Sequence, residues 1–345
     1  MSENNKRTEI GDLGEFGLID RLTKDLKIKH KTTAKGVGDD AAVFDYGGDE
    51  YTVLSTDILL EGIHFDLSFM PLQHLGYKAI AVNVSDIAAM NAIPEQVTVS
   101  IAVTNRFSVE AIEMIYEGIK AACENYNVDL VGGDTTSSRQ GLCISVTAVG
   151  RVKKDKIAYR SGAKKGDILC VTGDLGGAYM GLQVLLREKA VFEANPKMQP
   201  NLDNYQYVAG RQLRPEARTD VIHELNELGV VPTSMIDVSD GVASEVLHIC
   251  KASNVGAVVY EDKLPIDQDT FDVAHEFKIA SKTPALNGGE DYELLFTIKQ
   301  EDFPKLEKNA NVYFIGYIDE AENGARLFTE GEQTLPLTAQ GWKHF

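Results

Sequence analysis

The sequence lacks the features that mark secreted, membrane-spanning or zinc-binding proteins. Its 345 residues include only four cysteines, at positions 123, 143, 170 and 250, and no two of them form a CxxC pair. We therefore expect four reduced core thiols and no zinc site, an expectation that the absence of HExxH spacing among the seven histidines supports. No apolar run approaches the roughly 18 residues of a membrane span. The polar start, MSENNKRTEIGD, shows no secretory signal, so we expect a cytoplasmic protein.

Positive charge is scarce as well. The 34 lysines and arginines are outnumbered by 52 aspartates and glutamates, which gives a formal net charge of −18. Such a chain repels the nucleic-acid backbone and anionic membranes on average, but it does not repel divalent cations. We therefore expect neither a nucleic acid nor a membrane as a partner.

The common nucleotide-binding motifs are missing too. The chain has no GxxxxGK[ST] loop, no GxGxxG between a strand and a helix, and no HRD or DFG motif. These absences exclude P-loop, Rossmann and protein-kinase sites. The glycine-rich segment TGDLGGAYMG matches none of these motifs and is a weak signal by itself.

What is present is a globular composition, with 43% hydrophobic residues, in a chain long enough for roughly two domains. Hydrophobic periodicity predicts strands at 51–56, 96–104, 143–152, 168–172, 234–238, 257–260 and 292–298, and helices at 15–26, 75–90, 109–124, 178–188, 217–228 and 242–252. Ser108 is placed to cap one helix, and Asn91 is placed where another should end. Alternating strands and helices predict two α/β or α+β domains, residues 1–153 and 154–345, divided at a basic polar stretch.

Acidic residues recur beside glycines or after apolar stretches. They lie in the segments GDD (38–40), STD (55–57), NVSD (83–86), GGDT (132–135), DVSDG (237–241) and GGED (288–291). Any one of these could be a simple turn. Six together indicate a site, and clustered oxygen ligands suit Mg²⁺, which bridges to phosphate oxygens. Adjacent glycines let backbone N–H groups approach a phosphate. The sequence therefore predicts several Mg²⁺ ions and a polyphosphate.

Asp86 is the most informative single acid. It follows the apolar run AIAVNVS in a predicted helix, and Asn83, three residues earlier, shares its face. An unpaired carboxylate there is costly unless it pairs or binds a metal ion. The alternative is a partly exposed helix surface.

The motifs resemble those of the thiamine-monophosphate kinase family along nearly the whole chain, residues 14 to 345. They occur in the family's order: GVGDDAAV, LSTDILLEGIHF, YKAIAVNVSDIAAMNA, LVGGDTT, YRSGAKKGD, RPEAR, IDVSDG, NGGEDYELLF and GWKHF. The GDD, STD and VNxSD motifs are shared with the aminoimidazole ribonucleotide synthetase-like (PurM-like) superfamily, whereas GIHF, GGEDYEL and the closing GWKHF look specific to the kinase. Asn91 stands where the family commonly has glycine.

The resemblance implies a two-domain PurM-like fold and a homodimer formed through strands of the N-terminal domains, with the ATP site near the subunit junction. It also implies the reaction: ATP-dependent and Mg²⁺-dependent phosphorylation of thiamine monophosphate to thiamine diphosphate. Since the acceptor is itself a phosphate, no general base and no catalytic side chain in that sense is expected. We assign catalysis to positioning and metal charge.

The resemblance also implies roles for individual residues. The expected metal-site residues are Asp40, Ser55, Thr56, Asp57, Asp86, Asp134, Asp237 and Asp240, with Asp39 an alternative to Asp40. The expected ATP contacts are Tyr116, Gly133, Asp134, Arg160 and Ser239. The expected substrate-binding residues are His64, Glu290 and Trp342, where a Trp face suits a flat cationic ring and Glu290 would either accept a hydrogen bond from the pyrimidine amine or attract the ring charge.

Two alternatives remain open at this point. Another enzyme of the superfamily would share the ATP site, but a selenophosphate synthetase would need a reactive N-terminal cysteine, and none of the first 122 residues is cysteine. An aminoimidazole ribonucleotide synthetase should lack GWKHF. A non-catalytic nucleotide-binding or metal-binding module would explain the acids and glycines but not the substrate-pocket motifs.

Overall fold

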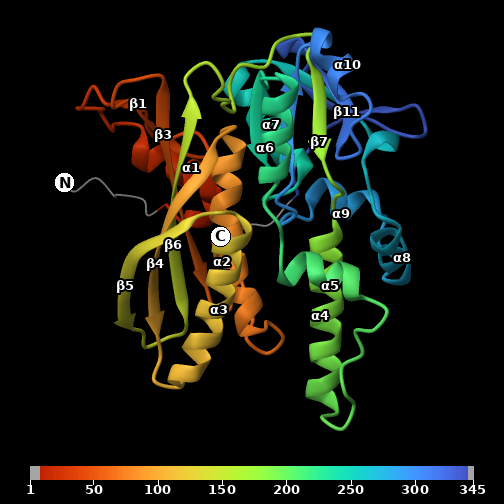
Figure 1. The fold of residues 1–345 in the computed structure, drawn as a ribbon. Helices are drawn as coiled ribbons and strands as arrows, with labels where there is room; N and C mark the ends of the chain where they lie inside the picture. The colour runs from red at the N-terminus through yellow and green to blue at the C-terminus, as the bar shows by residue number, and fades with distance from the viewer. Residues whose placement is uncertain (1–7, 341–345) are drawn as a thin grey trace, which may run out of the picture.

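The computed structural model describes residues 8–340, which form two β-sheets with helices packed against them (Figure 1). The first sheet has the strand order β1–β2–β3–β6–β4–β5, and only β4 and β5 are parallel. Its strands are β1 (Thr33–Lys35), β2 (Ala42–Phe44), β3 (Glu50–Leu60), β4 (Ile93–Val103), β5 (Asp129–Ser137) and β6 (Cys143–Lys153). Strand β5 therefore forms one edge of this sheet.

The second sheet has the order β13–β12–β9–β11–β7–β10–β8, with only β12 and β9 parallel. Its strands are β7 (Ile168–Thr172), β8 (Ser234–Asp237), β9 (Gly256–Tyr260), β10 (Leu294–Ile298), β11 (Val312–Asp319), β12 (Ala325–Phe328) and β13 (Thr334–Pro336). The α-helices are α1 (Gly14–Thr23), α2 (Leu72–Ala89), α3 (Val109–Asn125), α4 (Gly177–Ala194), α5 (Gln206–Leu213), α6 (Thr219–Leu228), α7 (Val242–Ser253), α8 (Gln268–Glu276), α9 (Lys282–Asn287) and α10 (Phe303–Leu306). The mixed α/β class predicted from the sequence is confirmed.

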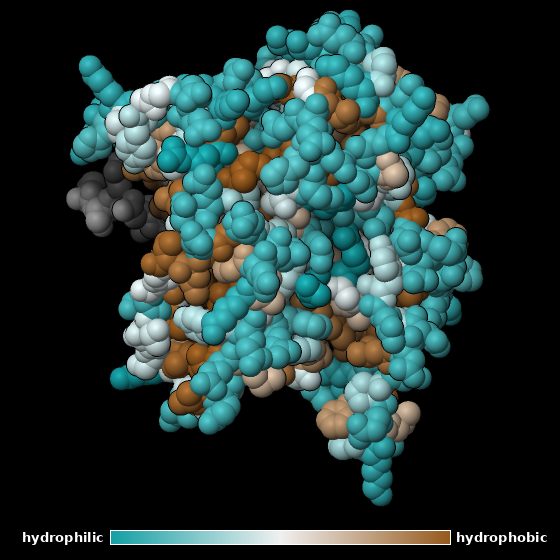
Figure 2. Space-filling view, in the orientation of Figure 1, coloured by the Kyte–Doolittle hydropathy of each residue, from teal (hydrophilic) through white to brown (hydrophobic). Residues whose placement is uncertain are grey.

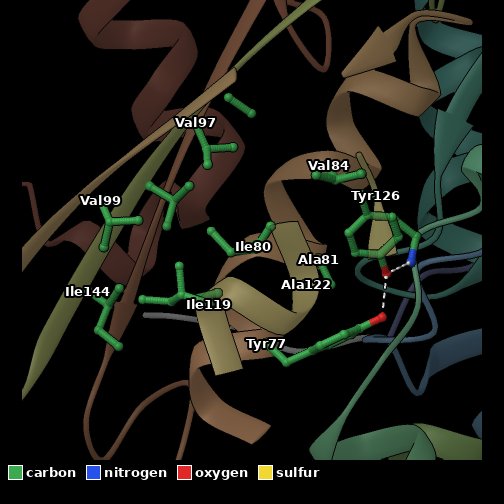
Figure 3. Packing of buried hydrophobic residues seen from close by; sticks show 14 of the residues in the cluster. Tyr77, Ile80, Ala81, Val84, Val97, Val99, Ile119, Ala122, Tyr126 and Ile144 are labelled. Carbon is green, nitrogen blue, oxygen red and sulfur yellow. Dashed lines mark hydrogen bonds between the residues drawn. The ribbon is translucent and has the colours of Figure 1, made fainter. Parts of the chain in front are cut away.

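Helix α2 is the central element because both halves of the chain bury it. Apolar residues occupy nearly all of its faces, as is typical of a fully buried helix. Ile80 and Val84 pack in the core of the first sheet, with strand residues such as Val99 (Figure 3). At its C-terminal end, Ala88 and Ala89 pack with side chains of the second sheet. The C-terminal part of α2 therefore lies between the two sheets.

Helices α2 and α3 pack unusually closely, and two glycines make this possible. A Cβ atom at Gly76 would lie 1.9 Å from the Ile115 carbonyl oxygen, and one at Gly118 would lie 1.8 Å from that of Gln73. Any larger side chain at either position would separate the helices. This contact fixes α2 against the first sheet.

The segment after α5 ties the second half of the chain to this core. The Ala217 backbone N–H donates a 2.9 Å hydrogen bond to the Tyr126 hydroxyl, which is paired with the Tyr77 hydroxyl (Figure 3). The Arg214 guanidinium lies 4.1 Å from the centre of the Tyr77 ring. Part of the RPEAR motif therefore attaches the second half of the chain to the helices of the first half.

Most predicted elements are present, with ends shifted by a few residues. Ser108 caps α3 as predicted, accepting a hydrogen bond from the Ala111 N–H at 3.3 Å. Asn91 adopts a left-handed φ of 55°, so asparagine serves where the family commonly has glycine. The four cysteines are free, as predicted. Within residues 8–340, no helix is both long and apolar enough to cross a membrane.

The sequence did not lead us to predict strand β5, nor several other short elements: β1, β2, β11, β12, β13, α5, α8, α9 and α10. Strand β2 lies inside GVGDDAAVF, which reads as a turn because glycine and aspartate dominate it. Strand β3 is longer than predicted, since it continues through Asp57 to Leu60. This continuation determines which side chains of STD face which side of the sheet.

Candidate active site

Three carboxylates from distant parts of the chain meet between the two sheets. Asp40 precedes β2, Asp86 lies on α2 and Asp237 ends β8, and each places one oxygen within 4.8 Å of the others. Asp40 and Asp237 are only 8% and 3% exposed. We call these three residues the acid cluster. Both halves of the chain contribute to it.

Each carboxylate of the acid cluster is held by a neighbouring side chain. The Ser55 hydroxyl donates to Asp86, and the Ser85 hydroxyl donates to Asp237 at 2.6 Å. Arg160 donates to Asp40 Oδ1 at 2.6 Å. The other oxygen, Asp40 Oδ2, is buried and has no hydrogen-bond partner among the described residues. A buried carboxylate oxygen without a donor fits a cation as its missing partner.

The electrostatics of the acid cluster also fit a cation. Burial raises the pKa of Asp86 well above its ordinary range, and the charges of the surrounding carboxylates raise it further. Burial, followed by the charge of Asp40, raises the pKa of Asp237 to about 7. The pKa of Asp40 is also raised by burial, although Arg160 opposes the shift. Oxygen-only ligands of this kind suit a hard divalent ion such as Mg²⁺.

Asp57 belongs with the acid cluster electrostatically. Burial raises its pKa, and its charge is the largest carboxylate contribution to the raised pKa of Asp86. Its backbone N–H donates to Asn83 Oδ1 at 3.0 Å. Asn83 and Asp86 therefore both face β3, as their spacing of three residues predicted.

The structure separates the roles of the two adjacent acids, Asp39 and Asp40. Asp39 accepts a hydrogen bond from the Arg160 backbone N–H at 2.9 Å and forms an ion pair with Lys35. Asp40 instead joins the acid cluster. Asp39 thus orients the Arg160 backbone, a role that the GDD motif does not reveal.

Two loops from the second half border the acid cluster, and both contain predicted site residues. The Glu290 backbone N–H donates to the Ser239 carbonyl at 2.7 Å, which joins the loops directly. The Asp240 backbone N–H donates to Glu245 Oε1 at 3.0 Å. Glu245 is 2% exposed, and burial raises its pKa. Sequence reasoning missed Glu245; its spacing after DVSDG, inside an apolar helix, was the available signal.

Glu290 is held by two residues that sequence reasoning also missed. Lys78 Nζ lies 2.8 Å from Glu290 Oε1, and Gln212 Nε2 donates to Glu290 Oε2 at 2.6 Å. Lys78 comes from α2 and Gln212 from α5. A lysine inside the apolar run of α2 was a signal, but its partner is 212 residues away.

The remaining predicted metal and ATP residues lie apart from the acid cluster. Residues alternate across β3, so Thr56 faces the opposite side from Ser55. The Thr56 hydroxyl donates to the Val146 carbonyl at 2.9 Å. Asp134 is exposed on edge strand β5, where a Cβ atom on the preceding Gly133 would lie 1.8 Å from the Val99 carbonyl oxygen.

Tyr116 lies on α3, half-buried against the core of the first sheet. It lines a groove of about 540 Å³ together with Val109, Ile112, Glu113, Glu117 and Lys120. Nothing in this groove resembles the acid cluster.

Of the predicted substrate residues, His64 follows β3 and accepts a 3.0 Å hydrogen bond at Nδ1 from the Leu60 backbone N–H. This bond orients the imidazole, and because Nδ1 is the acceptor, a neutral imidazole carries its proton on Nε2. Trp342 lies outside the described residues.

Comparison with known proteins assigns the family. Residues 38–152 match the family described as AIR synthase related protein, N-terminal domain. The chain is 34% identical over 338 residues to the thiamine-monophosphate kinase of Bacillus subtilis (strain 168), covering 96% of this chain and all of the relative. It is also 34% identical to the kinase of Aquifex aeolicus (strain VF5), with 97% of this chain covered and 99% of the relative. The chain belongs to the thiamine-monophosphate kinase family.

Solved structures agree with this assignment. The structure of AaThiL complexed with AMPPCP and TMP superposes with a TM-score of 0.84 at 32% identity, covering 99% of this chain and 100% of that one. The PurM-like fold expected from the sequence motifs is thereby confirmed. Within this PurM-like fold, the acid cluster lies between the two sheets.

Proposed function

We propose that this protein transfers the γ-phosphoryl group of ATP to the phosphate of thiamine monophosphate, giving ADP and thiamine diphosphate. The observation that carries the proposal is the acid cluster, with its unpartnered buried oxygen on Asp40. Family membership supports it, as does the AaThiL complex, which contains an ATP analogue together with TMP.

The residues present fit Mg²⁺. Asp40, Asp86 and Asp237 would hold it, with Asp57 adjoining them and Asp240 on the neighbouring loop. Bound there, Mg²⁺ would offset the repulsion between two phosphates and align them for in-line transfer. We propose that Ser55 acts through Asp86, whose carboxylate it orients by hydrogen bonding. Thr56 and Asp134 lie on the other side of the first sheet, so we propose that they would hold a further Mg²⁺ ion there.

The protein's own groups would position the reactants. Arg160 is held on its backbone side by Asp39 and on its side-chain side by Asp40, so its guanidinium would present a fixed fork to a nucleotide phosphate. Gly133, Ser239 and Tyr116 are proposed as further ATP contacts. The acceptor phosphate, a monoester with a second pKa of about 6, is mostly ionised at neutral pH. A general base is therefore not needed.

The substrate's organic part is assigned to three residues. Glu290 adjoins the acid cluster through its bond to Ser239, and we propose that it contacts the thiamine moiety together with His64 and Trp342. In this assignment the substrate's phosphate would bind at the acid cluster, and its rings would bind beside Glu290.

A homodimer is the second part of the proposal. Residues on the outer face of the first sheet and on β5 are unusually exposed for apolar side chains: Ile58 is 55% and Val131 is 60% exposed. Figure 2 shows apolar side chains gathered on the left of the view, where Figure 1 places the strands of this sheet. A second copy packed against this face would cover them and bring its own β5 close to Gly133 and Asp134.

Sedimentation velocity tests the dimer. Wild type should sediment as a dimer, and Val131→Asp should shift it towards monomer. Val109→Asp is the matched control, because Val109 is 71% exposed on α3, away from this face. A wild-type monomer, or equal effects of the two substitutions, would contradict the proposed interface.

We also propose a domain boundary at residues 153/154, supported by the end of β6 at Lys153, and a cytoplasmic location, supported by four free cysteines. Limited proteolysis would test the boundary, with cleavage expected between β6 and β7.

The decisive experiment for the reaction is direct. Incubate the purified protein with ATP, MgCl₂ and thiamine monophosphate, and separate the products by chromatography. Thiamine diphosphate and ADP should form in equal amounts, and EDTA should abolish both. ADP formation without thiamine diphosphate, or activity that survives EDTA, would contradict the proposal.

A further inference from the structure

Lys78 is a charged residue in a place where charge is costly. It is 0% exposed and lies on α2, the helix that both halves bury. Its ammonium contacts Glu290 Oε1 at 2.8 Å and the Gln212 carbonyl at 3.4 Å. Removing a lysine from water is tolerated only when a counter-charge accompanies it. Lys78 therefore depends on Glu290, and the pair forms one unit.

The carboxylate of this unit is fixed more firmly than an ordinary ion pair requires. Lys78 occupies one oxygen of Glu290, and Gln212 Nε2 occupies the other at 2.6 Å. The Glu290 backbone adopts a left-handed φ of 58°, which non-glycine residues rarely adopt, and Tyr292 does the same at 53°. Such strain persists where the surroundings hold it, and it is concentrated at ligand sites.

The unit has a buried side and an open side. The Lys78 side chain is 1% exposed, whereas the Glu290 side chain is 30% exposed. A ligand can therefore reach the carboxylate but not the ammonium. A carboxylate offers about four acceptor positions, so positions remain on Glu290 after Lys78 and Gln212 have each taken one.

Glu290 also lies beside the acid cluster. Its backbone N–H is bonded to Ser239, two residues after Asp237. The Tyr292 phenol senses both groups: burial raises its pKa, and the charges of Glu290 and of the cluster acids raise it further. One ligand can therefore place its phosphate at the acids and another part at Glu290.

We propose that Lys78 and Gln212 are positioning residues that turn Glu290 into a charge-balanced hydrogen-bond acceptor for the amine on the substrate's pyrimidine ring. The inference rests on the proposed function and goes further. With Lys78 at 2.8 Å the net charge of the unit is zero, so Glu290 is a weak counter-ion for the cationic thiazolium. Its fixed lone pairs still accept an N–H hydrogen bond. The site thus selects for the amine rather than for the ring charge.

Two substrate analogues separate these alternatives. In the first, oxygen replaces the pyrimidine amine; in the second, an uncharged ring of the same shape replaces the thiazolium. Wild type should prefer thiamine monophosphate over the first by about 10- to 150-fold in kcat/KM, the usual effect of one hydrogen bond to a charged group. Its preference over the second should be smaller.

Lys78→Met should shift the two preferences in opposite directions. Without the ammonium, Glu290 is less well oriented and carries net negative charge, so the amine preference should fall about 10-fold while the preference for the charged ring rises. The KM for ATP should stay within about twofold of wild type, because the nucleotide is bound elsewhere. Lys78→Arg should keep both preferences near wild type, and Lys308→Met, at an exposed lysine, should change neither.

The result that overturns the inference is a folded Lys78→Met protein whose two preferences are unchanged or fall together. If Lys78→Met does not fold, Gln212→Leu gives the answer, because it removes one donor to Glu290 and leaves the ion pair intact. Its amine preference should fall about threefold with no change in the charge preference, and an unchanged amine preference would overturn the inference. The proposed function fails separately, if wild type forms no thiamine diphosphate at all.

Discussion

The two sides of the first sheet differ in how completely the chain surrounds their predicted site residues. On the inner side, Asp40 and Asp237 are 8% and 3% exposed and meet Asp86 between the sheets. On the outer side, Thr56 faces away from α2, and Asp134 is exposed on an edge strand. The inner group is complete within one chain. The outer group is not enclosed by the described residues, and we propose that the nucleotide, a further Mg²⁺ ion and a second subunit complete it.

The largest effect should come from the inner group. Asp86→Asn should lower kcat/KM on the order of 100- to 1,000-fold, because it removes a carboxylate that would hold Mg²⁺. Without Mg²⁺, the free energy of unfolding should stay level or rise, since the substitution relieves repulsion among buried carboxylates. Enzyme assays and thermal melts with and without MgCl₂ would measure both. A large loss of stability without Mg²⁺ would indicate a structural carboxylate instead.

This contrast also shows how far the sequence alone can lead. The spacing of Asn83 and Asp86 was enough to place both on one helix face, because helix geometry is local. The choice between Asp39 and Asp40 was not predictable, since it depends on Arg160, whose backbone N–H bonds to Asp39, 121 residues earlier, and whose side chain bonds to Asp40, 120 residues earlier. Thr56 could have been separated from Ser55 by strand alternation, because the predicted strand, 51–56, contains both residues.

Contacts between distant segments set the limit most clearly. Lys78 could be recognised as anomalous in an apolar helix, but its pairing with Glu290 requires the two halves of the chain to be docked. Glu245 is similar, because its hydrogen bond from the Asp240 backbone N–H in the loop before α7 is not visible in the sequence. Local sequence patterns were therefore enough to predict most helices and strands, whereas the site is formed only when the two halves of the chain pack together.

A second prediction concerns the backbone of the outer group. Gly133→Ala should destabilise the protein by about 2–4 kcal/mol, because the added Cβ would lie 1.8 Å from the Val99 carbonyl oxygen. Gly132→Ala is a closely matched control: a Cβ there would meet only the Thr98 methyl, at 4.0 Å. Denaturant unfolding of both variants measures the difference. Equal stability would mean that β5 is not held against β4 as closely as described.

A third prediction uses pH to sharpen the comparison. The folded pKa of Asp237, about 7, lies above the ordinary value of an aspartate, so the folded protein binds this proton more tightly than the unfolded chain does. The associated stability is present at low pH and is lost as pH rises through 7. Without Mg²⁺, this group should therefore cost about 1 kcal/mol between pH 6 and 8, or a few degrees in Tm.

Asp237→Asn isolates that contribution, because groups with other trends remain in both proteins. His248 is one of them: burial lowers its pKa to about 4, so its stabilisation is lost as pH falls below its unfolded value. The fall in Tm from pH 6 to 8 should be smaller in Asp237→Asn than in wild type, and MgCl₂ should reduce the fall in wild type because cations favour the ionised form. An identical fall in Tm from pH 6 to 8 in the two proteins would contradict the link between the raised pKa of Asp237 and stability.

The smallest expected effect tests whether the outer side takes part at all. Thr56 donates to the Val146 carbonyl and accepts from the Thr147 hydroxyl, so Thr56→Val should cost about 0.5–1.5 kcal/mol in stability whatever its role. A hydroxyl that donates to a carbonyl can still offer a lone pair to a cation. If Thr56 completes the metal site, Thr56→Val should also raise the Mg²⁺ concentration for half-maximal activity by about two- to fivefold, whereas Thr56→Ser should leave it unchanged. Titrating MgCl₂ at saturating ATP measures this. A loss of stability with an unchanged Mg²⁺ requirement would confine the metal site to the inner side, and the outer side would then serve the nucleotide and the second subunit alone.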